Sequence, residues 1–320
     1  GETCLVMVAD YADNVTVYEL TYGGESEDYT GRMFGFTSGY FRGPANRWVE
    51  LDPETIWYDF RDEVGEGMET VAAAGKSFTA AEYVNGRIFT AATDGCMYTT
   101  LHGQWANYQK VGRFAGITDA IADMALNVQN GKLYALDTHN TLYTVDMITG
   151  ALTQVATLSA PPLDEWSSAP EFRTLAIDDE GNFYTINSGG STTAFLYRFT
   201  LEAMDTPELL GKPVYTDMDE WTGEEITVEP VATSTGQSLE WNCNDGLLYW
   251  TQYDSESEDW FNTAKLFQIH PETAACQKQP ANFFDDPVVA LFVRDLDRHE
   301  DAGWSQMTEQ VEQVALSAST

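Results

Sequence analysis

Basic residues are scarce in this chain. Lys and Arg number 16 among 320 residues, against 51 Asp and Glu, and the formal net charge is −35. A surface this acidic repels phosphate backbones and anionic lipid headgroups, which argues against binding to nucleic acids or to anionic membranes. Solubility through self-repulsion accounts for the charge. Adaptation to high salt and an affinity for cations such as calcium are the other two interpretations.

Long hydrophobic runs are also missing. The longest obvious one is Val288–Val293, whereas a membrane-spanning helix needs about 20 apolar residues. We therefore expect no membrane insertion. No leader sequence is visible, but the chain begins at Gly1 rather than Met. We interpret it as a mature or trimmed form, in which a missing leader decides nothing.

Cysteine and histidine are few and dispersed. The four cysteines, Cys4, Cys96, Cys243 and Cys276, include no Cys-x-x-Cys pair. Three disulfide pairings can be drawn, and the spacing does not choose among them. The four histidines are equally scattered, whereas a zinc site needs clustered Cys and His ligands. A zinc centre is therefore not expected.

A short phrase recurs along the chain. Its clearest copy is Gly131–Asp137 followed by Thr141–Asp146 and Thr149–Gly150, which alternates strands and turns. Related copies begin at Gly31, Gly86, Gly181 and Gly246. A repeat of roughly 40–50 residues that contains four short strands is typical of a β-propeller. The sequence therefore predicts an all-β fold with one propeller over residues 1–300, followed by a linker or the start of another domain over 301–320.

The strand that precedes each glycine is predicted to be the innermost of its blade, since small side chains suit the narrow axis. These inner strands are Phe78–Val84, Ile121–Val128, Thr174–Asp178, Ser238–Asn242 and, without a second strand after it, Val288–Val293. Asn-Gly, Asp-Gly or Glu-Gly pairs follow several of them and favour tight hairpins. Two further strands, Cys4–Ala9 and Val15–Tyr22, are expected near the N-terminus. If the two chain ends meet in one blade, the ring closes with six blades, while five or seven stay open as alternatives.

The segment 132–155, KLYALDTHNTLYTVDMITGALTQV, carries a family resemblance. It resembles the repeats of extracellular bacterial propellers of the quinoprotein-like and surface-layer type, whose units contain an Asp-x-x-Thr-Gly turn. The resemblance extends over about residues 28–295 and implies the fold and an extracellular or cell-surface location, with little said about activity. The patterns of WD repeats and of the sialidase Asp-box are absent from the sequence.

The last ten residues, Val311–Thr320, resemble the opening strand of bacterial immunoglobulin-like domains. If that holds, further domains of the same full-length chain follow the propeller. A short amphipathic helix around Met307, Val311 and Val314 is an equally good interpretation.

The sequence assigns no catalytic residue. No Gly-x-Ser-x-Gly motif is present to mark a nucleophile. Asp119, Asp123, Asp178 and Glu240 lie in or near inner strands and could face the channel, but a glycosidase needs two carboxyl groups about 5–10 Å apart. The sequence does not place such a pair.

Calcium is the one cofactor with candidate ligands, because oxygen-rich turns occur at 10–14 and 178–182. Asp10, Asp13 and Asp178 are the residues concerned. Ordinary turn chemistry explains the same residues, and no Asp-x-Asp-x-Asp-Gly loop is present.

Aromatic residues give the best binding signal. Trp166, Trp221 and Trp260, with Tyr253, lie among polar and acidic residues where a ligand could reach them, whereas Trp241 and Trp250 are expected in blade packing. These features predict a non-catalytic secreted or cell-surface propeller that recognises a glycan or a protein. The alternative is a lyase, lactonase or glycosidase with its site at the channel mouth. A structural spacer without a ligand is a third hypothesis.

Overall fold

The structure is a computed structural model of the whole chain. It describes residues 3–9, 15–21, 32–38, 46–51, 68–84, 86–101, 104–117, 119–163, 168–188, 193–218, 222–231, 236–254, 264–282 and 286–293. Every regular element in these ranges is a strand. No helix long and apolar enough to cross a membrane occurs among them.

The chain divides into two units, 1–30 and 31–320. The first unit contains one hairpin, in which β1 (Thr3–Ala9) pairs antiparallel with β2 (Val15–Thr21). Both strands were predicted from the sequence. Their pairing with each other uses the full length of both strands, from Thr3↔Thr21 to Ala9↔Val15.

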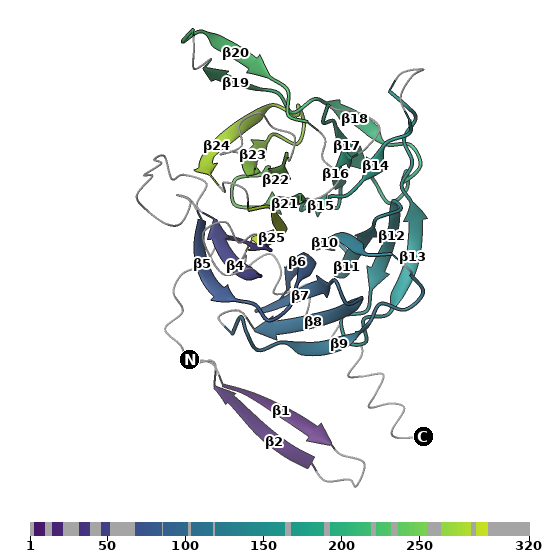
Figure 1. Ribbon diagram of the computed structural model, residues 1–320. Coiled ribbons are helices and arrows are strands. Elements are labelled where there is room, and N and C mark those ends of the chain that lie inside the picture. The colour runs from purple at the N-terminus through teal and green to yellow at the C-terminus, as the bar shows by residue number, and fades with distance from the viewer. Residues whose placement is uncertain are drawn as a thin grey trace. The chain divides into compact units, whose positions relative to one another are not determined.

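The second unit is a β-propeller of antiparallel sheets, which we number as blades in chain order (Figure 1). Blade 1 contains β25 (Val288–Val293), β3 (Met33–Thr37), β4 (Arg47–Leu51) and β5 (Met68–Ala73). Blade 2 contains β6 (Phe78–Val84), β7 (Arg87–Ala92), β8 (Cys96–Leu101) and β9 (Gln109–Arg113). Blade 3 contains β10 (Ile121–Asn127), β11 (Lys132–Asp137), β12 (Thr141–Val145) and β13 (Leu152–Thr157).

The remaining two blades follow the same plan. Blade 4 contains β14 (Glu171–Phe172) and β15 (Ala176–Ile177), which both pair with β16 (Phe183–Ser188), then β17 (Leu196–Phe199) and β18 (Glu208–Gly211). Blade 5 contains β21 (Ser238–Asn242), β22 (Leu247–Tyr253), β23 (Ala264–Ile269) and β24 (Cys276–Asn282).

The inner strands make the ring. In the order β25, β6, β10, β15 and β21 each contacts the next, and β21 contacts β25 again. Figure 1 shows these strands around the centre, with β5, β9, β13, β18 and β24 on the outside. The predicted propeller is therefore confirmed. It has five blades in the described part of the chain, a count that the sequence left open beside the favoured six.

Ring closure depends on the C-terminal strand. β25, predicted as an inner strand without a second strand after it, finds that second strand at the other end of the sequence, because it pairs antiparallel with β3. Arg47 of β4 forms a buried ion pair with Asp286, which lies just before β25. The closing blade is thus held by both main-chain pairing and charge. It takes β3, rather than the predicted Cys4–Ala9 and Val15–Tyr22, as the partner of the C-terminal strand.

The glycine turns have the geometry that the dipeptides predicted. Gly86, Gly131, Gly181 and Gly246 all have positive φ, between 66° and 84°. In the clearest of these turns, Gly131 N donates to Asn127 O at 2.8 Å, and Lys132 N donates to Asn130 Oδ1 at 3.0 Å. The side chain of the residue before the glycine therefore stabilises the hairpin that the glycine makes sterically accessible.

Apolar side chains fill the space between blades. One cluster joins blades 2 and 3 around Met97, Met124 and Leu133, and another joins blades 4 and 5 around Ile186, Trp250 and Phe267. Trp250 is fully buried and stacks on Phe267 with ring centroids 5.2 Å apart, as predicted for a blade-packing residue. Packing of this kind gives the ring a rigid wall, on which polar inner-strand residues are held.

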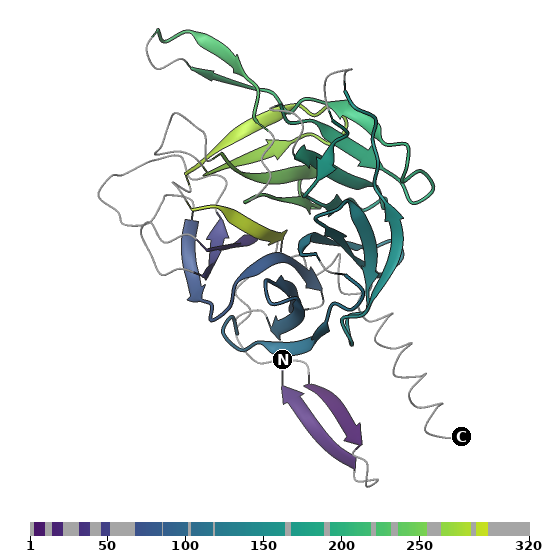
Figure 2. The ribbon, with the colours of Figure 1, turned by 45° about the vertical axis from the view of Figure 1, so that its right-hand side comes forward.

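One hairpin lies outside the blades. β19 (Tyr215–Met218) pairs with β20 (Glu225–Val228) in the acidic segment between blades 4 and 5. Figures 1 and 2 both show it projecting from the ring. Its base is fastened to β24 by Cys276 N, which donates to Val214 O at 3.3 Å, and by an ion pair between Lys278 and Asp217.

Candidate functional site

A buried carboxylate ties the inner strands together at the axis. Asp123 of β10 is fully buried, and its oxygens accept bonds from Leu175 N at 2.9 Å, Leu239 N at 3.1 Å and Ser238 Oγ at 3.0 Å. Ser238 Oγ in turn accepts a bond from Leu291 N of β25 at 3.1 Å. One side chain of blade 3 therefore connects the inner strands of blades 4, 5 and 1.

A second carboxylate makes the remaining connection. Glu82 of β6 is 2% exposed, and its Oε2 accepts a bond from Leu126 N of β10 at 2.8 Å. Its other oxygen accepts a bond from Tyr83 N at 2.7 Å. Buried carboxylates that accept several N–H bonds are fixed in place and shielded from ligands. We call Glu82, Asp123 and Ser238 the axial network.

This arrangement bears on the carboxylates proposed from the sequence to face the channel. Asp123 lies in the channel wall, where burial raises the pKa of its carboxyl group well above the ordinary value and its hydrogen bonds oppose that shift. Glu240 is buried on β21. Asp119 instead contacts His139, with Oδ2 3.2 Å from Nδ1, and its side chain is 34% exposed. Both oxygens of Asp123 thus accept hydrogen bonds, and the residue has a structural role in joining the blades.

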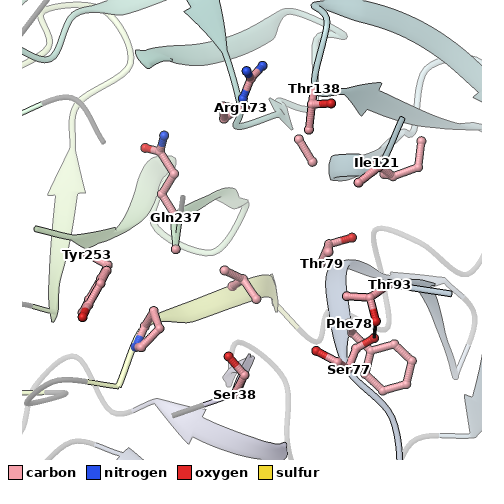
Figure 3. A pocket seen from close by; sticks show the side chains of 15 residues that line it. Ser38, Ser77, Phe78, Thr79, Thr93, Ile121, Thr138, Arg173, Gln237 and Tyr253 are labelled. Carbon is pink, nitrogen blue, oxygen red and sulfur yellow. Dashed lines mark hydrogen bonds between the residues drawn. The ribbon is translucent and has the colours of Figure 1, made fainter. Parts of the chain in front are cut away.

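Above the axial network lies a cavity of about 370 Å³ at the end of the channel where the inner strands begin (Figure 3). Its walls come from all five blades. The lining residues include the one just before each inner strand of blades 2, 3, 5 and 1, namely Ser77, Ala120, Gln237 and Pro287. Ligand sites are typically cavities of about 300–1,000 Å³ with a few convergent polar groups on apolar walls. The mouth of this channel has that character.

Glycine is required in one wall of the cavity. Gly236 has a φ of 69°, and a Cβ added there would lie 2.8 Å from Tyr253 Cβ and 2.9 Å from Pro287 Cβ. The missing side chain lets Tyr253 and Pro287 both lie against Gly236 beside the opening. Next to it, Gln237 Oε1 accepts a bond from Trp250 Nε1 at 3.0 Å, which fixes the amide orientation.

Hydroxyl groups dominate the polar part of the lining. Besides the phenol of Tyr253, they belong to Ser38, Ser77, Thr79, Thr93 and Thr138. Thr79 and Thr93 donate to main-chain carbonyls at 3.4 Å. Within the described part of the chain, the hydroxyls of Ser38, Ser77 and Thr138 have no hydrogen-bond partner. These three groups are therefore available to a ligand.

Arg173 is the only charged residue among the described lining residues of this cavity. It lies between β14 and β15, and both flanks are anchored: Phe172 N donates to Asn140 Oδ1 at 2.7 Å, and Leu175 N donates to Asp123. A second hollow of about 320 Å³ shares Arg173 and Thr138 with the first and adds His139, Asn140 and Glu171. Arg173 thus stands at the boundary of two adjoining hollows.

The hairpin turns of several blades share a feature that the sequence analysis missed. An acidic or amide side chain in the turn meets a tyrosine hydroxyl of the next strand. Such pairs are Asp94–Tyr98, Asn130–Tyr134, Asp137–Tyr143, Asp178–Tyr184 and Asp245–Tyr249. The recurring spacing of four or six residues between them is visible in the sequence and would have indicated the pairing.

Asp178, a candidate calcium ligand, belongs to one of these turns. Its oxygens accept bonds from Glu180 N, Asn182 N, Asn182 Nδ2 and Tyr184 Oη, at 2.8–3.0 Å. Turn chemistry therefore accounts for this residue. Within the described ranges no group of three His, Cys, Asp or Glu residues is arranged to hold a metal. The other candidates, Asp10 and Asp13, lie outside the described residues, and calcium stays a prediction.

Of the aromatic residues predicted to contact a ligand, only Tyr253 lies within the described ranges. Trp166, Trp221 and Trp260 lie outside the described residues. Tyr253 is half-buried and lines the mouth cavity, where Figure 3 shows its ring beside the opening. Trp241, predicted to pack in a blade, is half-buried against the core of blades 4 and 5, and its Nε1 donates to Asp179 Oδ2 at 3.3 Å.

Comparison with known proteins leaves the site unassigned. No family model matches the chain, and no curated protein matches it. Among solved structures, a protein of unknown function from Bacteroides thetaiotaomicron is 14% identical with a TM-score of 0.45, and the match covers 80% of this chain and 59% of that one. This chain therefore spans less than two thirds of that protein.

Two other similar structures are of proteins in complexes of different kinds. One is described as YCF48 bound to D1 peptide, with 11% identity, a TM-score of 0.36, and coverage of 78% of this chain and 67% of that one. The other is a chain of the COPII outer coat vertex on membranes, with 14% identity, a TM-score of 0.39, and coverage of 80% and 66%. The conclusion that this chain is a propeller rests on its own strand pairing.

Proposed function

We propose that this chain is a non-catalytic binding propeller, which holds a glycan or protein ligand at the mouth of its channel. The observation that carries the proposal is the mouth cavity of about 370 Å³, whose walls present unengaged hydroxyls, an anchored arginine and an aromatic ring. Each of these groups can bind polar ligands without reacting with them. The location would be extracellular or at the cell surface, as the resemblance of the repeat to extracellular propellers implies.

Catalysis is less well supported by the same site. Hydrolysis of a glycosidic bond needs two carboxyl groups beside the substrate, and the described lining residues of the cavity contribute none. Asp123, directly below, uses both oxygens in the axial network. Binding is therefore the function that this geometry favours, and the lyase, lactonase and glycosidase hypotheses find no acid–base pair in the described lining.

Filling the mouth tests the proposal. Ala120 is an exposed lining residue, and Ala120→Trp places a large side chain at the cavity without removing a polar contact. We expect binding on glycan and peptide arrays to fall at least about tenfold, because a blocked site loses most of its contacts. Ala151→Trp is the matched control, since Ala151 is an exposed alanine in the turn between β12 and β13 and does not line the cavity. Equal binding by both variants would contradict a ligand site at the mouth.

A further inference from the structure

The charged residue that lines the mouth cavity has the sign opposite to the net charge of the chain. Acidic residues outnumber basic ones 51 to 16, yet the charged residue in the described lining of the larger cavity is Arg173. The cavity's own polar groups are otherwise neutral hydroxyls and one amide. Arg173 pairs with Glu171 of the adjoining hollow, but it is the one charged side chain that lines the larger cavity among the described residues, so an anionic group can bind there.

The guanidinium group of Arg173 is held in place by hydrogen bonds that leave some of its N–H donors without a partner among the described residues. Nη1 donates to Phe172 O at 3.2 Å, and Nη2 donates to Glu171 Oε2 at 2.6 Å. A guanidinium carries five N–H donors, so three have no partner among the described residues. The Arg173 side chain is 16% exposed, while that of Glu171 is 56% exposed. Arg173 is therefore the more sheltered member of the pair, and a bound carboxylate can be bonded at its remaining donors.

The position of Arg173 is fixed from both sides. Asn140 Oδ1 accepts a bond from Phe172 N, and Asn140 Nδ2 donates to Pro170 O at 3.1 Å. On the other side Asp123 accepts a bond from Leu175 N. These anchors come from blade 3 and hold a segment of blade 4. A group positioned in advance binds its ligand with a smaller loss of conformational entropy.

Hydroxyl groups surround this cation on the shared wall and across the cavity. Thr138 lies beside Arg173 and lines both hollows, and Ser77 and Ser38 lie farther around the opening (Figure 3). A hydroxyl both donates and accepts, which complements the hydroxyls of a saccharide. The apolar wall residues Ala122 and Val289 and the ring of Tyr253 suit the C–H faces of sugar rings.

We propose, on the basis of the binding function above, that the ligand is a saccharide bearing a carboxylate, which pairs with Arg173 while sugar hydroxyls bind Thr138 and the serines. The two hollows that meet at Arg173 and Thr138 provide adjoining positions for two parts of an oligosaccharide. Arginine suits this role because its planar fork matches a carboxylate with two parallel bonds.

The test uses an array of uronate- and sialate-containing oligosaccharides, the methyl esters of the same compounds, neutral parents, and acidic peptides of equal charge. The strongest binder is then titrated by calorimetry. We expect the carboxylated saccharide to bind about 10- to 100-fold more tightly than its methyl ester, as for a charge-assisted hydrogen-bonded pair. Arg173→Ala should lower binding of the acid to the level of the ester and leave binding of the ester unchanged.

Two further variants test whether a loss of binding comes from the lost contact or from a loss of folding. Arg173→Lys keeps the charge and loses the fork, so binding of the acid should fall to an intermediate level. Arg198→Ala is the matched control, because Arg198 is a similarly sheltered arginine paired with Glu208 and Glu272 and lies outside both hollows. Its removal should leave binding unchanged.

The outcomes separate this inference from the function on which it depends. Three results would each overturn the proposal that the ligand is an acidic saccharide. Neutral saccharides could bind as tightly as the acids, the acid could still bind Arg173→Ala, or acidic peptides could bind more tightly than saccharides. If the ligand bound in such a case no longer binds Ala120→Trp, the proposal of a binding site at the mouth still holds. An array on which nothing binds at the mouth overturns both.

Discussion

The axis and the mouth of this propeller are built from the same strands yet treat polar groups in opposite ways. At the axis, Asp123 accepts bonds from three other residues of neighbouring blades, and Ser238 passes the network on to Leu291. At the adjoining mouth of the channel, Thr138 and Ser77 line an open cavity with hydroxyls that have no partner in the described ranges. Polar residues around the channel therefore hold the ring where their hydrogen bonds are satisfied and can bind a ligand where they are not.

The largest effect should follow from cutting the axial network. Asp123→Ala leaves Leu175 N, Leu239 N and Ser238 Oγ without their acceptor in a buried site. Each unsatisfied buried donor costs about 1–3 kcal/mol, so we expect the free energy of unfolding to fall by roughly 3–5 kcal/mol. Urea denaturation followed by tryptophan fluorescence measures it. A loss below about 1 kcal/mol would mean that the axis is not what holds the blades together.

The charge state of Asp123 gives a second, pH-dependent contrast. Burial raises the pKa of this carboxyl in the folded protein above its ordinary value of 3.8. Between the unfolded and the folded pKa, the unfolded chain has released the proton that the native state keeps, so stability falls as pH rises through that window. Asp123→Asn cannot titrate. Wild-type stability, measured relative to this variant in denaturant at a series of pH values, should therefore be greatest at low pH and decline above about pH 3.8.

A relative stability of wild type that rises with pH instead would place the folded pKa below the ordinary value. It would mean that the hydrogen bonds to Asp123 outweigh its desolvation. The axial network would then act as an anion site, and the contrast with the mouth would be one of charge as well as saturation.

Much of the ring could be predicted from the sequence because its strands are marked by local chemistry. Phe78–Val84, Ser238–Asn242 and Val288–Val293 match β6, β21 and β25 at both ends. Hydrophobic runs bounded by Asn-Gly or Asp-Gly turns give such limits without any tertiary information. The blade count was harder, because the partner of β25 is β3, some 250 residues earlier in the chain, and no local pattern specifies a pairing at that distance.

Of the residues predicted to contact a ligand, Tyr253 lines the mouth, but the rest of the lining was not predicted, for a different reason. Attention to tryptophans singled out Trp166, Trp221 and Trp260, whereas the cavity is lined by small and hydroxylic residues with one arginine. A usable signal was present: Ser77, Ala120, Gln237 and Pro287 each immediately precede an inner strand. Residues at equivalent positions of a closed ring must meet at one end of its channel. The role of Arg173 could not be read in this way, because it depends on the anchors at Asn140 and Asp123.

The smallest and sharpest test compares two threonines. Thr174 is fully buried, and its Oγ1 accepts a bond from Ile186 N at 2.8 Å, whereas Thr138 is half-buried at the mouth. Valine has nearly the same shape as threonine without the hydroxyl. Thr174→Val should lower the free energy of unfolding by about 1–2 kcal/mol and leave ligand binding unchanged, because a buried N–H loses its acceptor.

Thr138→Val should do the reverse. Its hydroxyl has no partner in the described part of the chain, so we expect stability to change by less than about 0.5 kcal/mol. Binding at the mouth should weaken about three- to tenfold, the effect of one lost hydrogen bond to a ligand. Thermal melts give the stability of each variant, and calorimetric titrations give its affinity for the ligand. If both threonines affected stability alone, hydroxyls at the mouth would serve the fold as those at the axis do, and the contrast between the axis and the mouth would disappear.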